Sequence, residues 1–234
     1  MVAALEREVR PLIKHWRVSE KEYGGRRFRF FEHDDAVLVC GGIGAGAARR
    51  AAEAVIAIYL PAVVCSIGFV GALEPGLKVG TVVQPSQVIN AGDASRVNLG
   101  GGSGVLVSFG SVATPAQKAR LKESFGAQVV DMEAAAVARA AEARGVEFAA
   151  VKVVSDEFDF EFPAMERFVD SEGRFREGRF TMFAALRPWL WMKLLRLASN
   201  SNRATRALSD WLGASMSQML MRAGTPGPEA VHRS

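Results

Sequence analysis

Short apolar runs alternate with alanine-rich, amphipathic segments along the first two thirds of the chain. The apolar runs are rich in β-branched residues and bounded by glycine, proline or polar residues, which is typical of buried strands. Two of the segments between them end at glycine, the usual helix stop. We expect strands within 35–40, 62–71, 77–89, 104–109, 127–132 and 146–156, and helices within 47–59, 115–126 and 133–145.

This alternation predicts an α/β fold. Strands that are apolar throughout are buried on both faces, so helices should cover both sides of a mostly parallel sheet. In such sheets ligands bind at the carboxyl ends of the strands. We expect one domain over residues 1–222, since a large sheet domain reaches this length.

The pattern changes after residue 160, where an aromatic and charged segment begins. From about residue 179 the sequence predicts two C-terminal helices broken near Pro188. Residues 223–234 are rich in Gly and Pro, and we expect a disordered tail.

Composition narrows the class of protein. The chain of 234 residues has a net charge of +4, which is weak evidence for a nucleic-acid partner, and we expect none. Cys40 and Cys65 lie in separate apolar runs, and the three histidines are isolated, so we expect neither a disulfide nor a metal site. The N-terminal residues contain acids where a signal peptide would be apolar, so we expect a cytoplasmic protein.

The GGIGAG motif at 41–46 lies between an expected strand and an expected helix. Its glycine spacing differs from GxGxxG, and the next strand ends without the acid that would bind a ribose of a dinucleotide. No Gly-Lys-Ser/Thr follows, so a P-loop is excluded as well. Two interpretations stay open: a tight turn that allows close helix packing, or a loop that faces a substrate.

Carboxylates follow three of the expected strands. Glu8 comes shortly after VAAL, Asp131 and Glu133 come after AQVV, and Asp156 ends the last apolar run. Each acid alone is explained by helix capping or by the helix dipole. Together they predict a site at one edge of the sheet, where three strand ends should converge.

At these residues the chain resembles the nucleoside phosphorylase and nucleosidase superfamily. The resemblance rests on ALEREV at 4–9, GGIG at 41–44, GFVGALEPGLKVGTVV at 68–83, VDMEAAAVA at 130–138 and VVSD at 153–156. Within the superfamily the chain is most similar to methylthioadenosine/S-adenosylhomocysteine nucleosidases and hopanoid-associated phosphorylases. The resemblance implies a three-layer α/β/α sandwich on a mixed sheet, assembled as dimers or larger oligomers, and an enzyme of purine nucleoside metabolism without cofactor or metal.

The resemblance also implies residue roles. Asp156 would protonate the leaving purine, with Ser155 orienting its carboxyl group, and Glu8 would activate water. Met132 and Glu133 would bind the ribose. Further loop contacts with the substrate would come from Gly71, Val70 and Ile43. These roles suit cleavage of an N-glycosidic bond, whose cationic transition state is stabilised by a carboxylate and whose purine leaving group needs a proton.

The charge of Glu8 bears on whether water or phosphate is the nucleophile. A phosphorylase gathers a phosphate dianion, usually with arginine, and the Glu8 carboxylate would repel it. We therefore expect a hydrolase that acts on a 5'-substituted adenosine such as methylthioadenosine or S-adenosylhomocysteine, as in methionine salvage. The alternative is a phosphorylase, with Arg7, Arg10, Arg49 and Arg50 as candidates for the phosphate site.

The chain departs from the family where the adenine would stack. Phe69 replaces a small polar residue, and SFGSVA at 108–113 lacks the expected aromatic. Phe158, Phe160 and Phe162 would either cap the base or form a half-buried strand. A non-catalytic nucleoside-binding module is therefore a further alternative.

Residues 187–206 offer a hypothesis of another kind. On a helix, one mainly basic stripe would lie opposite an apolar stripe, as in interfacial membrane helices. The basic stripe comprises Lys193, Arg196, Asn200 and Arg203, and the apolar one Leu190, Trp191, Leu194 and Leu197. The helix would either contact a membrane peripherally, which favours a lipid-linked adenosine as substrate, or pack on the sheet or a partner subunit.

Overall fold

The computed structural model describes residues 1–161 and 191–223. Its strands form one mixed sheet. They are β1 (Val2–Ala3), β2 (Arg17–Tyr23), β3 (Arg26–His33), β4 (Ala36–Cys40), β5 (Val63–Ala72), β6 (Val82–Val83), β7 (Gln87–Asn90), β8 (Arg96–Asn98), β9 (Val105–Ser108), β10 (Val129–Asp131) and β11 (Glu147–Asp156). The helices are α1 (Glu6–Ile13), α2 (Ala45–Tyr59), α3 (Pro115–Phe125), α4 (Ala134–Glu142) and α6 (Trp191–Ala223).

Parallel pairing is concentrated in the middle of the sheet. Strand β1 lies parallel between β4 and β5, and β11 pairs in parallel with almost the whole of β5. Strands β2, β3 and β8 add antiparallel pairs at the two ends of the sheet order. The sheet is therefore mixed, as the family resemblance implied.

Strand β5 has an unusual edge. Strand β11 follows one edge of β5, while β1 and β10 share the other: β1 pairs at Ser66, and β10 pairs antiparallel at Gly71 and Ala72. Between these pairings, residues 67–70 have no strand partner on that edge within the described chain. The two short strands therefore end facing each other and leave an opening beside the middle of β5.

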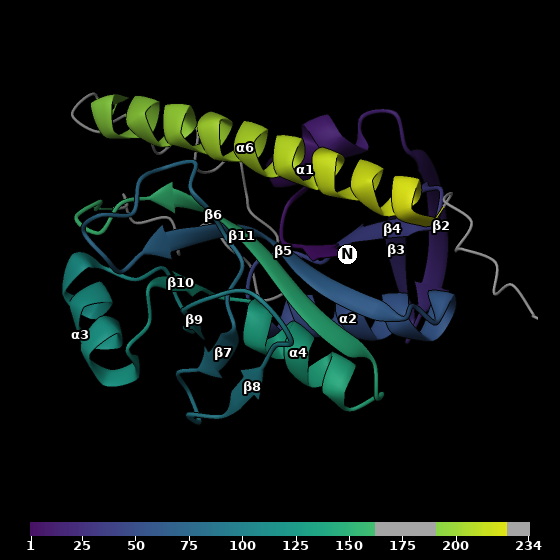
Figure 1. Ribbon diagram of the computed structural model, residues 1–234, viewed down its shortest axis with the longest axis horizontal. Coiled ribbons are helices and arrows are strands. Elements are labelled where there is room, and N and C mark those ends of the chain that lie inside the picture. The colour runs from purple at the N-terminus through teal and green to yellow at the C-terminus, as the bar shows by residue number, and fades with distance from the viewer. Residues whose placement is uncertain (162–190, 224–234) are drawn as a thin grey trace, which may run out of the picture.

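Helices cover both faces of the sheet, which confirms the three-layer architecture. Helices α2 and α4 pack together on one face, and α1 and the long α6 pack together on the other (Figure 1). Helix α3 lies beside β9, away from these pairs (Figure 1).

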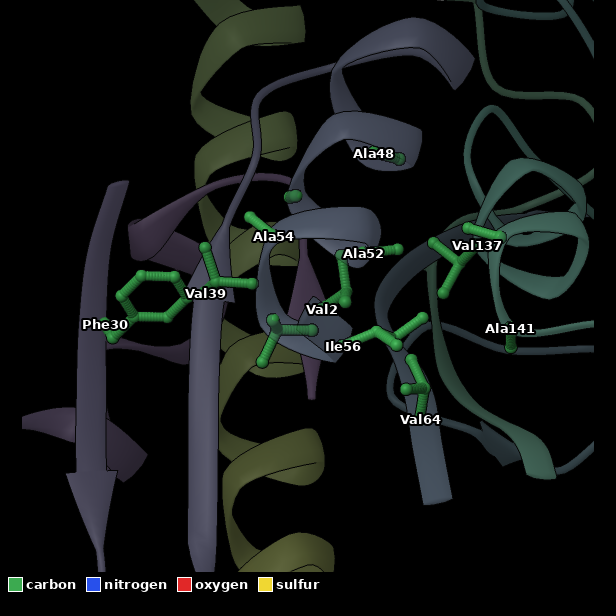
Figure 2. Close-up of a cluster of buried hydrophobic side chains, with 13 residues drawn as sticks. Val2, Phe30, Val39, Ala48, Ala52, Ala54, Ile56, Val64, Val137 and Ala141 are labelled. Carbon is green, nitrogen blue, oxygen red and sulfur yellow. The ribbon is translucent and has the colours of Figure 1, made fainter. Parts of the chain in front are cut away.

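On β1 and β3, neighbouring residues belong to opposite layers of the hydrophobic core. Val2 and Phe30 belong to the cluster under α2 and α4, which Figure 2 shows, whereas Ala3 and Phe31 belong to the cluster under α1 and α6. The period of two along a strand produces this division. The alanines of α2, such as Ala51 and Ala52, let that helix approach the sheet closely.

The ends of α3 follow from its sequence. Thr114 and Gln117 form a reciprocal capping box, and Pro115 occupies the first turn, where its missing N–H costs nothing. Gly126 closes the helix in the left-handed conformation with φ 63°. The predicted helix and its stop are confirmed.

Several expectations about element boundaries need correction. The run 77–89 contains two strands, β6 and β7, which pair with different partners. Residues 157–161 contain a turn, so the half-buried strand that the phenylalanines suggested is wrong over this part, and Phe162 lies outside the described residues. The sequence analysis did not anticipate the β2–β3 hairpin, whose turn residues Gly24 and Gly25 both have positive φ.

At the C-terminus, α6 occupies the region where the second of the two helices was expected. The region of the first helix lies outside the described residues, as does the expected tail at 223–234 apart from Ala223, which is the last residue of α6. Lys193 pairs with Glu161 at 2.9 Å, and Arg196 with Glu157 at 3.7 Å, so two members of the basic stripe contact acids of the same chain. No helix in the described part of the chain combines the length and hydropathy that a membrane span requires.

The docking of α6 is tested by truncating one buried side chain. Leu208 is 0% exposed in the core cluster beneath α1 and α6, whereas Leu195 on the same helix is 65% exposed. We expect Leu208→Ala to lower the free energy of unfolding by about 2–5 kcal/mol, since it removes transfer energy and leaves a cavity. Leu195→Ala should change it by less than about 0.5 kcal/mol. Urea denaturation of the three proteins measures the difference, and equal stabilities would show that α6 is not docked through Leu208.

Candidate functional site

A cleft opens at the gap between the ends of β1 and β10. Its lining includes the unpaired stretch of β5 and the predicted residues from every strand end. All eight predicted site residues line it: Glu8, Ile43, Val70, Gly71, Met132, Glu133, Ser155 and Asp156. The convergence was expected at the carboxyl edge of parallel strands, but β10 runs antiparallel to β5. That reversal brings Asp131 back toward the end of β1.

Glu8 enters the cleft from the first turn of α1. Its side chain is buried, and its Oε2 atom has no hydrogen-bond partner among the described residues. Gly68, with φ 138°, makes room for it, because a Cβ atom there would lie 2.7 Å from Glu8 Oε2. Burial, followed by the nearby charge of Glu133, raises the pKa of Glu8 to about 8.

Glu133 connects the two loops on either side of the cleft. Its Oε1 atom accepts a hydrogen bond of 2.7 Å from the backbone N–H of Gly44, and its Oε2 accepts one of 3.2 Å from Met132 N–H. Burial, followed by the charge of Asp131, raises the pKa of Glu133 to about 7. The GGIGAG loop is therefore part of the site wall, since Gly44 binds Glu133 and Ile43 lines the cleft.

Asp131 lies in a closed network of hydrogen bonds. Its Oδ1 accepts from Ser108 Oγ at 2.6 Å, and its Oδ2 accepts from Ala134 N–H at 2.9 Å and from Lys152 Nζ at 2.9 Å. Lys152 also donates to Ser66 Oγ at 2.9 Å. Burial lowers the pKa of Lys152, but neighbouring carboxylates outweigh burial and the pKa is raised overall. Asp131 thus has a structural role in capping α4 and holding Lys152.

Asp156 lines the cleft from the carboxyl end of β11. A register shift between β11 and β5 after Val154 brings Asp156, rather than Ser155, opposite Gly71. Ser155 Oγ donates to Asp156 Oδ1 at 2.8 Å, and Lys118 Nζ donates to Asp156 Oδ2. Burial raises the pKa of Asp156, although the ammonium group of Lys118 acts in the opposite direction.

Neither buried lysine was recognised from the sequence as a site residue. Lys152 had a detectable signal, because it is the one charge inside the apolar run 148–155. Lys118 had none, because it lies in a helix that also contains Arg120 and Lys122, and its burial depends on long-range packing. Each lysine forms an ion pair with a carboxylate of the cleft.

Phe158 and Phe160, two of the three phenylalanines considered for capping the base, lie outside the described lining of the cleft. Phe160 is buried beneath Arg196, at 5.6 Å. Phe69 does line it. Within residues 1–161 and 191–223, no group of three or more His, Cys, Asp or Glu side chains is placed to hold a metal ion.

The chain matches the model of one protein family. The sequence profile of the phosphorylase superfamily matches residues 1–115 and 102–177. A search of curated proteins by sequence returned no match.

Solved structures with the same fold include three nucleosidases. The 5'-methylthioadenosine/S-adenosylhomocysteine nucleosidase of Helicobacter pylori is 16% identical with a TM-score of 0.68, covering 93% of this chain and 96% of the other. The futalosine hydrolase structure from the same species has the same identity, TM-score and coverage. The nucleosidase of Neisseria meningitidis is 20% identical with a TM-score of 0.61, covering 89% of this chain and 96% of the other.

The raised pKa of Glu8 predicts a specific dependence of stability on pH. The unfolded chain releases this proton near the ordinary value of 4.5, whereas the folded protein keeps it up to about 8. Between these values the folded state binds one more proton, so the free energy of unfolding falls as pH rises. Glu8→Gln removes this contribution.

We therefore expect the variant to gain stability over the wild type progressively between pH 5 and pH 8, by up to several kcal/mol. Urea denaturation across this range measures the gain. Glu6→Gln, which changes an exposed acid of the same helix, should retain the wild-type trend. A constant difference between Glu8→Gln and wild type would contradict the assignment of a buried, protonated Glu8.

Proposed function

Because the chain belongs to the phosphorylase superfamily, a superfamily of enzymes, we propose that it hydrolyses the N-glycosidic bond of a purine nucleoside. We further propose a 5'-substituted adenosine as substrate, either methylthioadenosine or S-adenosylhomocysteine, in purine nucleoside metabolism and methionine salvage. The names of the solved nucleosidases with this fold support that choice of substrate class. A cytoplasmic homodimer, without cofactor or metal, completes the proposal.

The observation that carries the proposal is the placement of two buried carboxyl groups along β5. Glu8 packs over Gly68, and Asp156 packs over Gly71. Gly68 and Gly71 are on the order of 10 Å apart along β5. Both carboxyl groups line the same cleft, and two carboxyl groups that flank a sugar can act on a water at one face and on a leaving group at the other, as in inverting glycosidases.

Asp156 is assigned to the leaving purine. Its hydrogen bond from Ser155 fixes the plane of the carboxyl group, and burial favours a bound proton. A proton delivered to the purine neutralises the charge that develops as the bond to the sugar breaks.

Glu133 and Met132 are assigned to the ribose. The two backbone N–H groups that hold Glu133 leave lone pairs on each oxygen for sugar hydroxyl groups. Ile43, Val70 and Gly71 complete the walls around the nucleoside.

Glu8 is assigned to the water. Its Oε2 atom, which has no hydrogen-bond partner in the described part of the chain, is an acceptor available for a water proton. Its pKa of about 8 means that the basic form increases as pH rises toward that value. We expect the rate to rise over the same range.

Water is favoured over phosphate by the distribution of arginines. Of the four arginines considered for a phosphate site, only Arg7 belongs to the described lining of the cleft. Arg49 pairs instead with Glu53 of its own helix, at 3.8 Å. A phosphate dianion would also meet Glu8, Glu133 and Asp131 at close range, which disfavours its binding.

The proposal is tested with purified protein and methylthioadenosine or adenosylhomocysteine, with and without phosphate, by following free adenine. We expect release that does not depend on phosphate. Asp156→Asn should abolish turnover while leaving nucleoside affinity within about tenfold, because the amide keeps the shape of the side chain but cannot donate an acidic proton. Asp159→Asn changes an exposed acid three residues away and serves as the matched control.

Other outcomes would redirect the assignment. Release that requires phosphate would identify a phosphorylase, and an adenosylated lipid should then be added as substrate. Nucleoside binding without release would identify a binding module. An active Asp156→Asn variant would remove Asp156 from the mechanism.

A further inference from the structure

Lys118 is a charged side chain that the proposed reaction has not yet used. It projects from α3, is 1% exposed and lines the cleft. Its ammonium group donates to Asp156 Oδ2 and to the backbone carbonyl of Glu157, the latter at 2.7 Å. A side chain with three N–H donors and no acceptor is costly to bury unless its charge is used or compensated.

The contacts of Asp156 create a chemical problem. Ser155 donates to one of its oxygens and Lys118 to the other. A carboxyl group that receives donors at both oxygens is held as an acceptor, the arrangement of the ionised form. In this form Asp156 has no proton for a leaving purine, so the proposed role needs a proton source.

We propose that Lys118 is this source and that its proton passes through Asp156 to the purine. The inference rests on the proposed N-glycosidic cleavage and deepens it by naming a residue that acts through Asp156. Lys118 thus completes the acid end of the site, as Glu8 forms the base end.

Protons and electrons balance in the proposed step. As the bond between the sugar carbon and the purine breaks, its electron pair moves onto the purine. A proton moves from Lys118 Nζ to Asp156 Oδ2, and the proton of Asp156 moves to N7 of the purine, which leaves as the neutral base. Water adds to the sugar carbon and gives its proton to Glu8. When products leave, Lys118 recovers a proton and Glu8 releases one, so no net proton is consumed.

The packing around the pair supports a proton transfer. A Cβ atom on Gly71 would lie 2.8 Å from Asp156 Oδ2 and 3.3 Å from Lys118 Nζ, so the pair is seated directly on that glycine. Burial from water removes the solvent that would otherwise stabilise the separated charges. Burial also raises the pKa of Asp156 against the effect of Lys118, which favours a proton on Asp156.

Other charges near the pair belong to identified partners. Glu157 follows Asp156 and pairs with Lys78, at 3.4 Å, and with Arg196 of α6. The remaining charged groups of the described cleft are Arg7, Glu8, Asp131, Glu133 and Lys152. Lys118 is the cation in hydrogen-bond contact with Asp156.

The experiment compares two leaving groups in Lys118→Met. Methionine keeps the length of the side chain but removes the proton and the charge. For methylthioadenosine we expect kcat to fall by about 100-fold or more, the usual contribution of a proton donor. For p-nitrophenyl riboside, whose phenolate leaves without protonation, kcat should stay within about fivefold of wild type.

The pH profile gives a second readout. With Lys118 absent, Asp156 must hold the proton alone, so the alkaline limb of kcat for methylthioadenosine should move to lower pH. Lys122→Met changes an exposed lysine one turn further along α3 and serves as the control. It should have the wild-type kcat for both substrates and the wild-type alkaline limb in the pH profile.

The p-nitrophenyl substrate also protects the test against misfolding, because a Lys118→Met protein that failed to fold would lose both activities and show no pH limb at all. Equal losses for both leaving groups with an unmoved alkaline limb would overturn the role of Lys118 and leave the proposed function standing. A wild-type protein that cleaves neither substrate would overturn the proposed function, and this inference with it.

Discussion

The site depends on one constraint in the sheet, namely that two strands running in opposite directions share one edge of β5. Strand β1 approaches from one end and β10 from the other, and each stops before they meet. The residues between them, 67–70, therefore expose an edge that is normally paired. Because α1 starts directly after β1 and α4 directly after β10, the acids in the loops and first turns, Glu8 and Glu133, are delivered to this gap. The chain builds its cleft by ending strands early rather than by adding a separate loop.

Two glycines of β5 make room for the acids that lie in this gap. Gly68 and Gly71 are positions where any side chain would collide with Glu8 or with the Asp156 and Lys118 pair. A strand interior disfavours glycine, because it adds backbone entropy and offers no side chain to pack. Here the missing side chains let two carboxyl groups lie on the backbone itself. The weakness of the strand is offset by β11, which pairs along nearly its whole length.

Much of the fold could be predicted from the sequence, because local signals and tertiary packing agree. The stop at Gly126 marked the end of α3, and the apolar runs marked β5 and β11. The hairpin of β2 and β3 was missed although Gly24 and Gly25 mark its turn, because charged residues on its strands obscured the alternation. The direction of β10 could not be predicted, since strand pairing depends on contacts far apart in the sequence.

Some residues of the candidate site could be predicted from the sequence, and others could not. The acids were recognisable because they follow strands and match family motifs. The lysines were harder to recognise, because nothing in the neighbouring sequence distinguishes Lys118 from the surface residue Lys122. Its partner decides its burial, and that partner lies 38 residues further along the chain. Residues that serve a site by compensating a charge are therefore harder to find from sequence than the residues they compensate.

The charges of the cleft also link substrate binding to protonation. The charge of Glu133 raises the pKa of Glu8, since two carboxylates in a buried site repel. Sugar hydroxyl groups that donate to Glu133 would stabilise its ionised form and keep a negative charge beside Glu8. That charge would make Glu8 a stronger base toward the attacking water, while it also favours the positive charge that develops on the sugar. Binding of the ribose at one carboxyl group would in this way prepare the other, which explains why both acids are buried in one cleft despite the cost to stability.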